Sequence, residues 1–224
     1  MKRPYIYVLP KRDFFTRGPR GSVTHALGVV EGLIESGHHV TVVGGPGVAS
    51  NLSHSPTDAA RVVQIVAPTR RWERSLIDVV EATRVCDSVT LVRYAPRHLF
   101  TIRSLCASGR TLIEVNSLFA QQGRVRRFGT LGRWVAQAVD KGALSRAFGV
   151  YAVSTPTANR VRRMTDAPVR VLRNAASQAT LDHEPVRISG ADGGQFSVLY
   201  AGTLQKYYDF IPIVVAIEHL RAHV

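Results

Sequence analysis

The sequence is poor in cysteine, in acidic residues and in long apolar runs, and each shortage excludes a class of protein. Its two cysteines, Cys86 and Cys106, lack metal-binding or redox spacing, so we expect reduced thiols in a cytoplasmic protein. No apolar run approaches the roughly 18 residues that a membrane-spanning helix needs. The apolar run after Arg3 is too short for a signal peptide, and no small-residue cleavage site follows it.

Acidic residues are outnumbered, with 16 Asp and Glu against 29 Lys and Arg, which gives a net charge of +13. This imbalance predicts an anionic partner, which is nucleic acid, an anionic membrane or a phosphorylated small molecule. No helix-turn-helix, zinc or RRM signature is present, so we expect no nucleic acid as a partner. The length of 224 residues allows one large α/β core, or one domain and part of another.

The amino-terminal stretch has the pattern of one βαβ unit. Residues 5–9 are apolar and predict a strand, and Val23 to Ser36 has helical apolar spacing. Residues 40–43 predict a second strand, which is parallel to the first in a right-handed unit. Ser22 is expected to cap the helix and Gly37 to end it.

A glycine loop joins the first strand to this helix. Gly18 and Gly21 allow a sharp turn and a close approach of the backbone to a ligand. The free amides and the positive end of the following helix attract an anion. Two interpretations stay open, a phosphate-binding loop and a tight turn without a ligand.

Strands and helices alternate through the rest of this region. Further strands are predicted at 62–66, 90–94, 111–115, 150–153 and 169–172. Helices are predicted at 72–85, 98–107, most of 123–148 and 156–164, and a loop at 44–57. This alternation predicts the α/β class, a Rossmann-like parallel sheet with helices on both faces. Ligands bind such sheets outside the carboxyl ends of the strands, so one edge is expected to carry the glycine loop, Tyr94, Asn116, Ser154 and Asn174.

The pattern changes after residue 176. Residues 177–195 are polar and typical of an interdomain linker. A buried-type strand at 196–202 and an amphipathic helix at 210–220 follow, and these two elements alone cannot bury their apolar faces. We therefore predict a domain at 1–176, a linker at 177–195 and an incomplete Rossmann-like domain at 196–224.

Six motifs, in order, resemble those of family 4 glycosyltransferases, which are retaining enzymes of the GT-B fold. The resemblance covers the amino-terminal domain and the first strand and helix of the carboxy-terminal domain. The motifs are Gly18-Pro19-Arg20-Gly21-Ser22-Val23-Thr24-His25, Gly37-His38-His39-Val40-Thr41-Val42-Val43, Leu112-Ile113-Glu114-Val115-Asn116, Val153-Ser154, Val171-Leu172-Arg173-Asn174 and Val198-Leu199-Tyr200-Ala201-Gly202-Thr203-Leu204.

In that family two Rossmann-like domains face each other across a cleft. The resemblance implies transfer of a sugar from a nucleotide-sugar donor to a glycan or polyprenol-linked acceptor, with retention and with no cofactor or metal. Together with the net charge, the lipid-linked acceptors of many relatives favour a cytoplasmic protein that is peripheral on the inner face of the membrane. Carried over residue by residue, the substrate- and donor-binding positions are Gly18, Arg20, Gly21, Ser22, His25, Glu114, Asn116, Ser154, Asn174, Gly202, Thr203 and Lys206.

The chain departs from the family pattern at several of these positions. Asn116 stands where many relatives carry a histidine, so an amide hydrogen bond would replace the role of that histidine. Asn174 lies in the turn at the domain junction without the usual proline and glycine neighbours, and Thr203 stands where an arginine is frequent. The paired glutamates of the second domain would fall beyond Val224. We therefore interpret the chain as an incomplete enzyme.

Several residues and functions have competing interpretations. His25 and Glu114 fit a functional role and a packing or pairing role about equally. A basic segment interleaved with apolar side chains fits a solvated helix face or a membrane-surface helix, and its arginines are Arg124, Arg126, Arg127 and Arg133. A nicotinamide-dependent oxidoreductase is disfavoured because the chain lacks Gly-x-Gly-x-x-Gly. A GT-B epimerase and a non-catalytic domain that partners another chain stay open.

Overall fold

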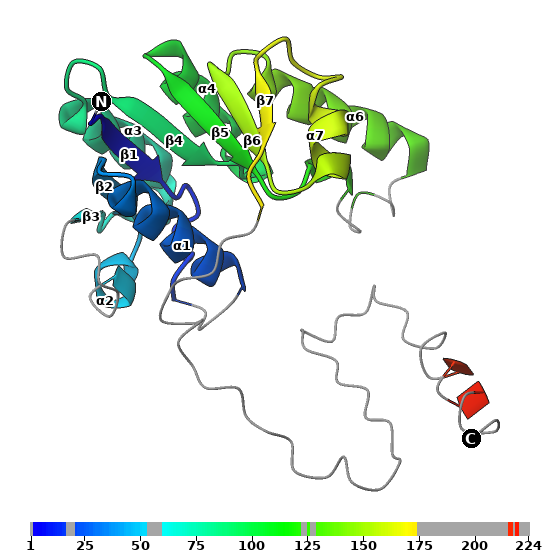
Figure 1. The fold of residues 1–224 in the computed structure, drawn as a ribbon. Helices are drawn as coiled ribbons and strands as arrows, with labels where there is room; N and C mark the ends of the chain where they lie inside the picture. The colour runs from blue at the N-terminus through cyan, green and yellow to red at the C-terminus, as the bar shows by residue number, and fades with distance from the viewer. Residues whose placement is uncertain are drawn as a thin grey trace, which may run out of the picture. The chain divides into compact units, whose positions relative to one another are not determined.

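The computed structural model describes residues 2–16, 21–52, 60–121, 125, 129–173, 215, 216, 218 and 219 (Figure 1). The chain divides into two units, Met1–His183 and Glu184–Val224. The first unit contains the sheet described below. The predicted boundary at 176, the linker at 177–195 and the strand at 196–202 lie outside the described residues. The four described residues after 173 are helical, and they fall within the predicted 210–220 helix.

The first unit is built on one seven-stranded parallel sheet with the order β3-β2-β1-β4-β5-β6-β7 (Figure 1). The order reverses between β1 and β4, which makes the carboxyl ends of these two strands a topological switch point. The strands are β1 Pro4–Val8, β2 His39–Gly44, β3 Arg61–Gln64, β4 Val89–Arg93, β5 Thr111–Val115, β6 Gly149–Ala152 and β7 Val169–Val171. The predicted α/β class and Rossmann-like parallel sheet are confirmed.

Helices connect the strands and cover both faces of the sheet. The helices are α1 Gly21–Glu35, α2 Val48–Leu52, α3 Trp72–Thr83, α4 Leu99–Ala107, α6 Gly129–Leu144 and α7 Thr155–Val161, with short 3₁₀ turns η1 Thr69–Arg71, η2 Pro96–His98 and η3 Phe119–Gln121. Among the described residues, no helix is long and apolar enough to span a bilayer.

Alternation along the strands divides the core into two layers. On one face Ile6, Val92 and Ile113 pack with buried side chains of α3, α4, α6 and α7. On the other face Tyr7 and Leu91 pack with α1 and α2. Arg93 and Glu114 follow Val92 and Ile113 in sequence, so they lie on the α1 face of the sheet.

The bounds of several predicted strands and helices are shifted by a few residues, and two local predictions are wrong. The segment predicted as a loop at 44–57 contains the short helix α2, because Val48 and Leu52 are buried one helical turn apart in the α1-side core. Ser22 was predicted as the cap of α1, but α1 begins at Gly21, so Ser22 lies inside the first turn. Gly37 ends this helix as predicted, with a φ of +80° and a bond from the His38 amide to the Leu33 carbonyl of 3.0 Å.

Candidate functional site

A buried cluster of polar side chains lies at the switch point, where β1, β4 and β5 run side by side. Glu114 of β5 is at its centre and is 0% exposed. The Tyr7 hydroxyl of β1 donates to Glu114 Oε2 at 2.6 Å. His25 Nε2 of α1 lies 3.2 Å from Glu114 Oε1, and Arg93 Nη1 of β4 lies 3.3 Å from the same oxygen. Four separate elements therefore meet at one carboxylate.

Arg93 links this carboxylate to the start of α1. Its Nη1 donates to the Ser22 carbonyl at 3.2 Å, and its guanidinium carbon lies 5.1 Å from the centre of the Phe14 ring. Asn116, with its amide oriented to satisfy both neighbours, donates to Glu114 Oε1 at 3.2 Å and accepts from Arg93 Nε at 3.1 Å. Arg93 is buried, and Ser22 and Asn116 are half-buried. Ser22 and Asn116 are thus the cluster members nearest to solvent.

The charges of the cluster follow from these contacts. Burial alone would raise the pKa of Glu114, but the hydrogen bonds from His25 and Tyr7 and the charge of Arg93 outweigh it, so the pKa lies below its ordinary value. Burial and the neighbouring Glu114 carboxylate raise the pKa of Tyr7 well above its ordinary value. At neutral pH, Glu114 is therefore an anion and Tyr7 is a protonated donor.

This arrangement suits Glu114 to holding neighbouring side chains in position rather than to proton transfer. A fully buried carboxylate with a lowered pKa cannot act as a general acid at neutral pH. It can fix the orientation of the Arg93 guanidinium and of the His25 imidazole under the first turn of α1. A rigid cation near a helix start favours an anionic ligand, because both present positive potential to it.

A second buried carboxylate, Asp140, lies on the opposite face of the sheet, near Tyr94 at the end of β4. Asp140 of α6 accepts a hydrogen bond from the Tyr94 hydroxyl and is 0% exposed. Its two oxygens also accept from the backbone amides of Phe119 at 2.8 Å and Ala120 at 3.0 Å. Asp140 therefore holds the turn η3 against α6.

The sequence predictions of site residues divide into three groups, apart from Arg133, which lies on α6 and lines the second hollow described below. Ser22, His25, Glu114 and Asn116 come together in the buried cluster, and Gly21 begins α1 beside them. Ser154 caps α7 by accepting from the Thr157 amide at 3.4 Å, away from the cluster. Nine predicted residues lie outside the described residues: Gly18, Arg20, Arg124, Arg126, Arg127, Asn174, Gly202, Thr203 and Lys206.

Sequence reasoning missed Tyr7 and Arg93 as members of the cluster. Tyr7 looks like an ordinary aromatic strand residue, and only its pairing with a distant strand shows its role. Arg93 carried a weak signal, since a charged residue that ends an apolar strand needs a partner when it is buried. In the register of β4 and β5, Arg93 pairs directly with Glu114.

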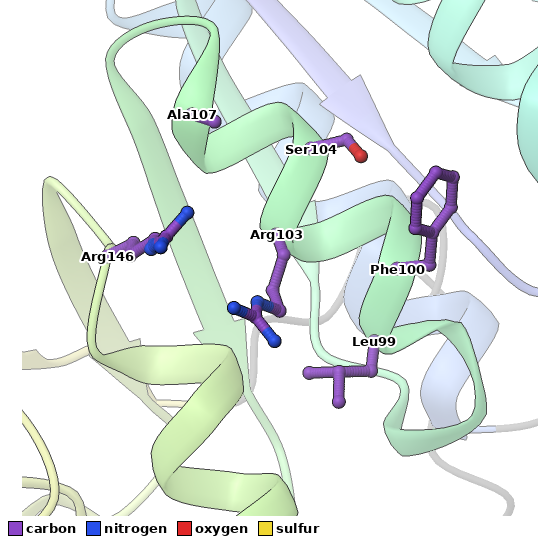
Figure 2. A pocket seen from close by; sticks show the side chains of 6 residues that line it. All are labelled: Leu99, Phe100, Arg103, Ser104, Ala107 and Arg146. Carbon is purple, nitrogen blue, oxygen red and sulfur yellow. The ribbon is translucent and has the colours of Figure 1, made fainter.

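Among the hollows formed by the described residues are two that no residue of the buried cluster lines. The first, of about 570 Å³, lies along the outer side of α4, with Arg146 coming from the segment after α6 (Figure 2). This first hollow is lined by Leu99, Phe100, Arg103, Ser104, Ala107 and Arg146. The second hollow, of about 600 Å³, lies between η3, α6 and α7. Within the described ranges, no group of three His, Cys, Asp or Glu residues could hold a metal ion.

The sheet order and the buried cluster define a Rossmann-like α/β domain with its polar centre at the switch point. Its fold is similar to that of a sucrose-phosphate synthase from Thermosynechococcus elongatus, with a TM-score of 0.50 and 15% sequence identity. The match covers 77% of this chain and 48% of that chain, so it spans about half of that protein's length. The expected resemblance to a GT-B glycosyltransferase domain is thereby confirmed for the fold. No protein-family model and no curated protein matches the sequence.

Proposed function

We propose that this chain is part of a glycosyltransferase that moves a sugar from a nucleotide-sugar donor to a glycan or lipid-linked acceptor with retention. The six sequence motifs and the GT-B-like fold support the class of reaction. The observation that carries the proposal is the Glu114 cluster, which holds Arg93 and His25 at the topological switch point, where doubly wound sheets bind their ligands.

The energetics of this cluster favour a functional role over a purely structural one. Moving a carboxylate and a guanidinium out of water costs several kcal/mol per ion, and their attraction only partly offsets this cost. An apolar pair would fill the same volume without the cost. Buried charges that orient one another at a ligand-binding edge are typical of functional sites.

We assign proposed roles to four side chains of the cluster, Arg93, Asn116, Glu114 and Tyr7. Arg93 and the first turn of α1 supply positive potential for the phosphate or sugar side of the donor. Asn116 offers an amide hydrogen bond to the transferred sugar, in place of the family's histidine. Glu114 and Tyr7 hold these groups in position without touching the ligand.

Ligand binding by the 224-residue chain is the first test. We expect saturation-transfer NMR to detect binding of at least one member of a panel of UDP-, GDP-, ADP- and dTDP-sugars. Asn116→Ala should weaken that binding, because it removes an amide hydrogen bond without opening the core. Arg61→Gln is the control, since this exposed arginine is on β3 at the far side of the sheet.

Failure of every nucleotide sugar to bind would contradict the proposed donor class. A ligand that binds Asn116→Ala and the wild type equally would contradict the proposed site. If transfer is observed, the anomeric configuration of the product tests retention, and an inverted product would exclude the proposed mechanism.

We also propose that α6 binds the chain to the anionic inner face of the cytoplasmic membrane. Leu131, Trp134 and Val135 are exposed and share one side of the helix by their spacing. Large apolar side chains on a strongly basic chain are typical of interfacial helices, because they insert among head groups while cations bind the anionic surface.

A further inference from the structure

The second hollow, between η3, α6 and α7, has an unusual lining. We call it the arginine groove. Its polar lining residues are three arginines and two glutamines, and none of the described lining residues is acidic. Its lining comprises Leu118, Ala120, Gln121, Arg133, Gln137, Arg160, Arg163 and Met164.

The arginines of this groove serve no evident structural purpose. Within the described part of the chain, no carboxylate pairs with Arg133, Arg160 or Arg163. Arg162 lies between two of them and does have structural partners, at the Asn159 side chain and the Val169 carbonyl. Like charges that line one groove repel each other, and an anion bound among them would remove this repulsion.

The groove has walls that are fixed before any ligand arrives. Asp140 clamps η3 to α6, as described above. Gln121 Oε1 accepts from the Leu118 amide at 3.1 Å, which fixes its side chain and leaves its NH₂ group as a donor. The Thr165 hydroxyl donates to the Leu144 carbonyl at 2.9 Å, so the turn after α7 is tied to the end of α6. Preformed walls reduce the ordering cost of binding.

We propose that the arginine groove binds a small, soluble molecule that carries a phosphate monoester or a diphosphate. Guanidinium groups match phosphate oxygens with two parallel hydrogen bonds, and several of them fit a ligand with more than one negative charge. Gln121 and Gln137 add neutral donors for ester or hydroxyl oxygens. The groove lies apart from the Glu114 cluster, so this proposal does not depend on the proposed glycosyltransferase activity.

Calorimetric titration of the 224-residue chain with sodium pyrophosphate tests the proposal. We expect saturable binding that weakens as salt is added. Arg160→Gln and Arg163→Gln should each reduce the affinity about fivefold or more, because each removes charge-assisted hydrogen bonds. Both side chains are exposed, so both variants should keep the wild-type melting temperature.

Two matched variants distinguish binding in the arginine groove from general attraction to the positive charge of the chain. Arg61→Gln removes the same charge from an exposed site on β3, and it should leave the affinity unchanged. Arg163→Lys keeps the charge and loses the planar fork, so it should bind more weakly than the wild type and more tightly than Arg163→Gln. Equal losses in Arg61→Gln and Arg163→Gln, or no effect of either groove variant, would overturn the proposal.

Two further experiments test whether the groove is separate from the proposed donor site and whether its ligand is a soluble molecule or a lipid head group. The Arg160→Gln, Arg163→Gln double variant should bind a nucleotide sugar as the wild type does, which distinguishes this site from the donor site proposed above. Co-sedimentation with phosphatidylcholine vesicles that contain phosphatidylglycerol should be the same for the wild type and the Arg160→Gln, Arg163→Gln double variant. Loss of vesicle binding in that variant, without pyrophosphate binding by the wild type, would assign the groove to lipid head groups and overturn a soluble ligand.

Discussion

Tyr7 and Glu114 are 107 positions apart in the sequence, and the Tyr7 hydroxyl donates to the Glu114 carboxylate at 2.6 Å. This hydrogen bond joins the first strand of the sheet to β5 across β4. It therefore forms only when three parallel strands have taken their final register. The bond ties the integrity of the candidate site to that of the whole sheet.

We predict that removing the charge of Glu114 destabilises the protein strongly. Glu114→Gln leaves Arg93 as a buried cation without its counter-ion, which costs about 3–5 kcal/mol in the free energy of unfolding. Tyr7→Phe should cost about 1–3 kcal/mol, because one acceptor site of a buried carboxylate loses its donor. Denaturant unfolding measures both, and the double variant should cost less than the sum. Strict additivity would show that the two side chains are not coupled.

The dependence of the unfolding free energy on pH in the acid range should reveal the lowered pKa of Glu114. A carboxyl group whose pKa is lower in the folded state stabilises the protein above its unfolded-state value, which is about 4.3 for Glu. That contribution is lost as the pH falls from this value through the folded-state pKa. We expect the unfolding free energy of the wild type to fall more steeply below about pH 4.3 than that of Glu114→Gln. Parallel curves would contradict the assignment.

The dependence of the unfolding free energy on pH in the alkaline range should reveal the raised pKa of Tyr7. Here stability is lost as the pH rises, whereas for Glu114 it is lost as the pH falls. A tyrosine with a raised folded-state pKa stabilises the protein below its unfolded-state value, about 10, and this contribution is lost as the pH rises above it. Tyr7→Phe should therefore lose less stability than the wild type above about pH 10. Tyr94→Phe is a useful comparison, because burial and Asp140 also raise the pKa of Tyr94.

Asp140→Ala should loosen η3 and weaken the arginine groove together. The change leaves the Phe119 and Ala120 amides and the Tyr94 hydroxyl without their acceptor, at a cost of about 3 kcal/mol. Hydrogen exchange should be faster at the two amides, and pyrophosphate affinity should fall. Asp78→Ala, at an exposed site on α3, is the matched control and should change neither. Unchanged exchange at Phe119 and Ala120 would show that the clamp does not hold the turn.

Membrane binding should depend on the apolar side of α6. Trp134→Gln and Leu131→Gln should reduce co-sedimentation with anionic vesicles and leave the melting temperature unchanged, because both side chains are exposed. Phe100→Gln is a close control, since Phe100 on α4 is 66% exposed, as is Trp134. Changing Arg124, Arg126 and Arg127 to Glu should also reduce binding, at about 1 kcal/mol per charge. Equal losses for Phe100→Gln would point to nonspecific adhesion.

The periodicity of the sequence predicted the sheet well, because strands buried on both faces are apolar and helices carry apolar stripes. The family resemblance included His25, Glu114 and Asn116 among its site residues, and these three lie together in the buried cluster. The same reasoning missed the short helix α2, where only Val48 and Leu52 carry the pattern. It also missed Tyr7 and Arg93, because strand neighbours at large sequence separation cannot be read from local spacing.

The arginine groove was outside the reach of sequence reasoning for a related physical reason. Its residues come from η3, α6 and the end of α7, and their convergence depends on how these elements pack. Arg133 was predicted as a membrane-surface residue together with its apolar neighbours. The structure instead includes it in the groove lining, and its membrane role stays a prediction.

The helix α6 carries polar groove residues on one side and exposed apolar side chains on the other. Arg133, Gln137 and Asp140 follow one another at i, i+4 and i+7 and face η3 and α7, whereas Leu131, Trp134 and Val135 lie around the other side. A chain resting on a bilayer through its tryptophan side would therefore keep its guanidinium side in water. Attachment and ligand exchange could then proceed at the same time, and substitutions could adjust either one without disturbing the other.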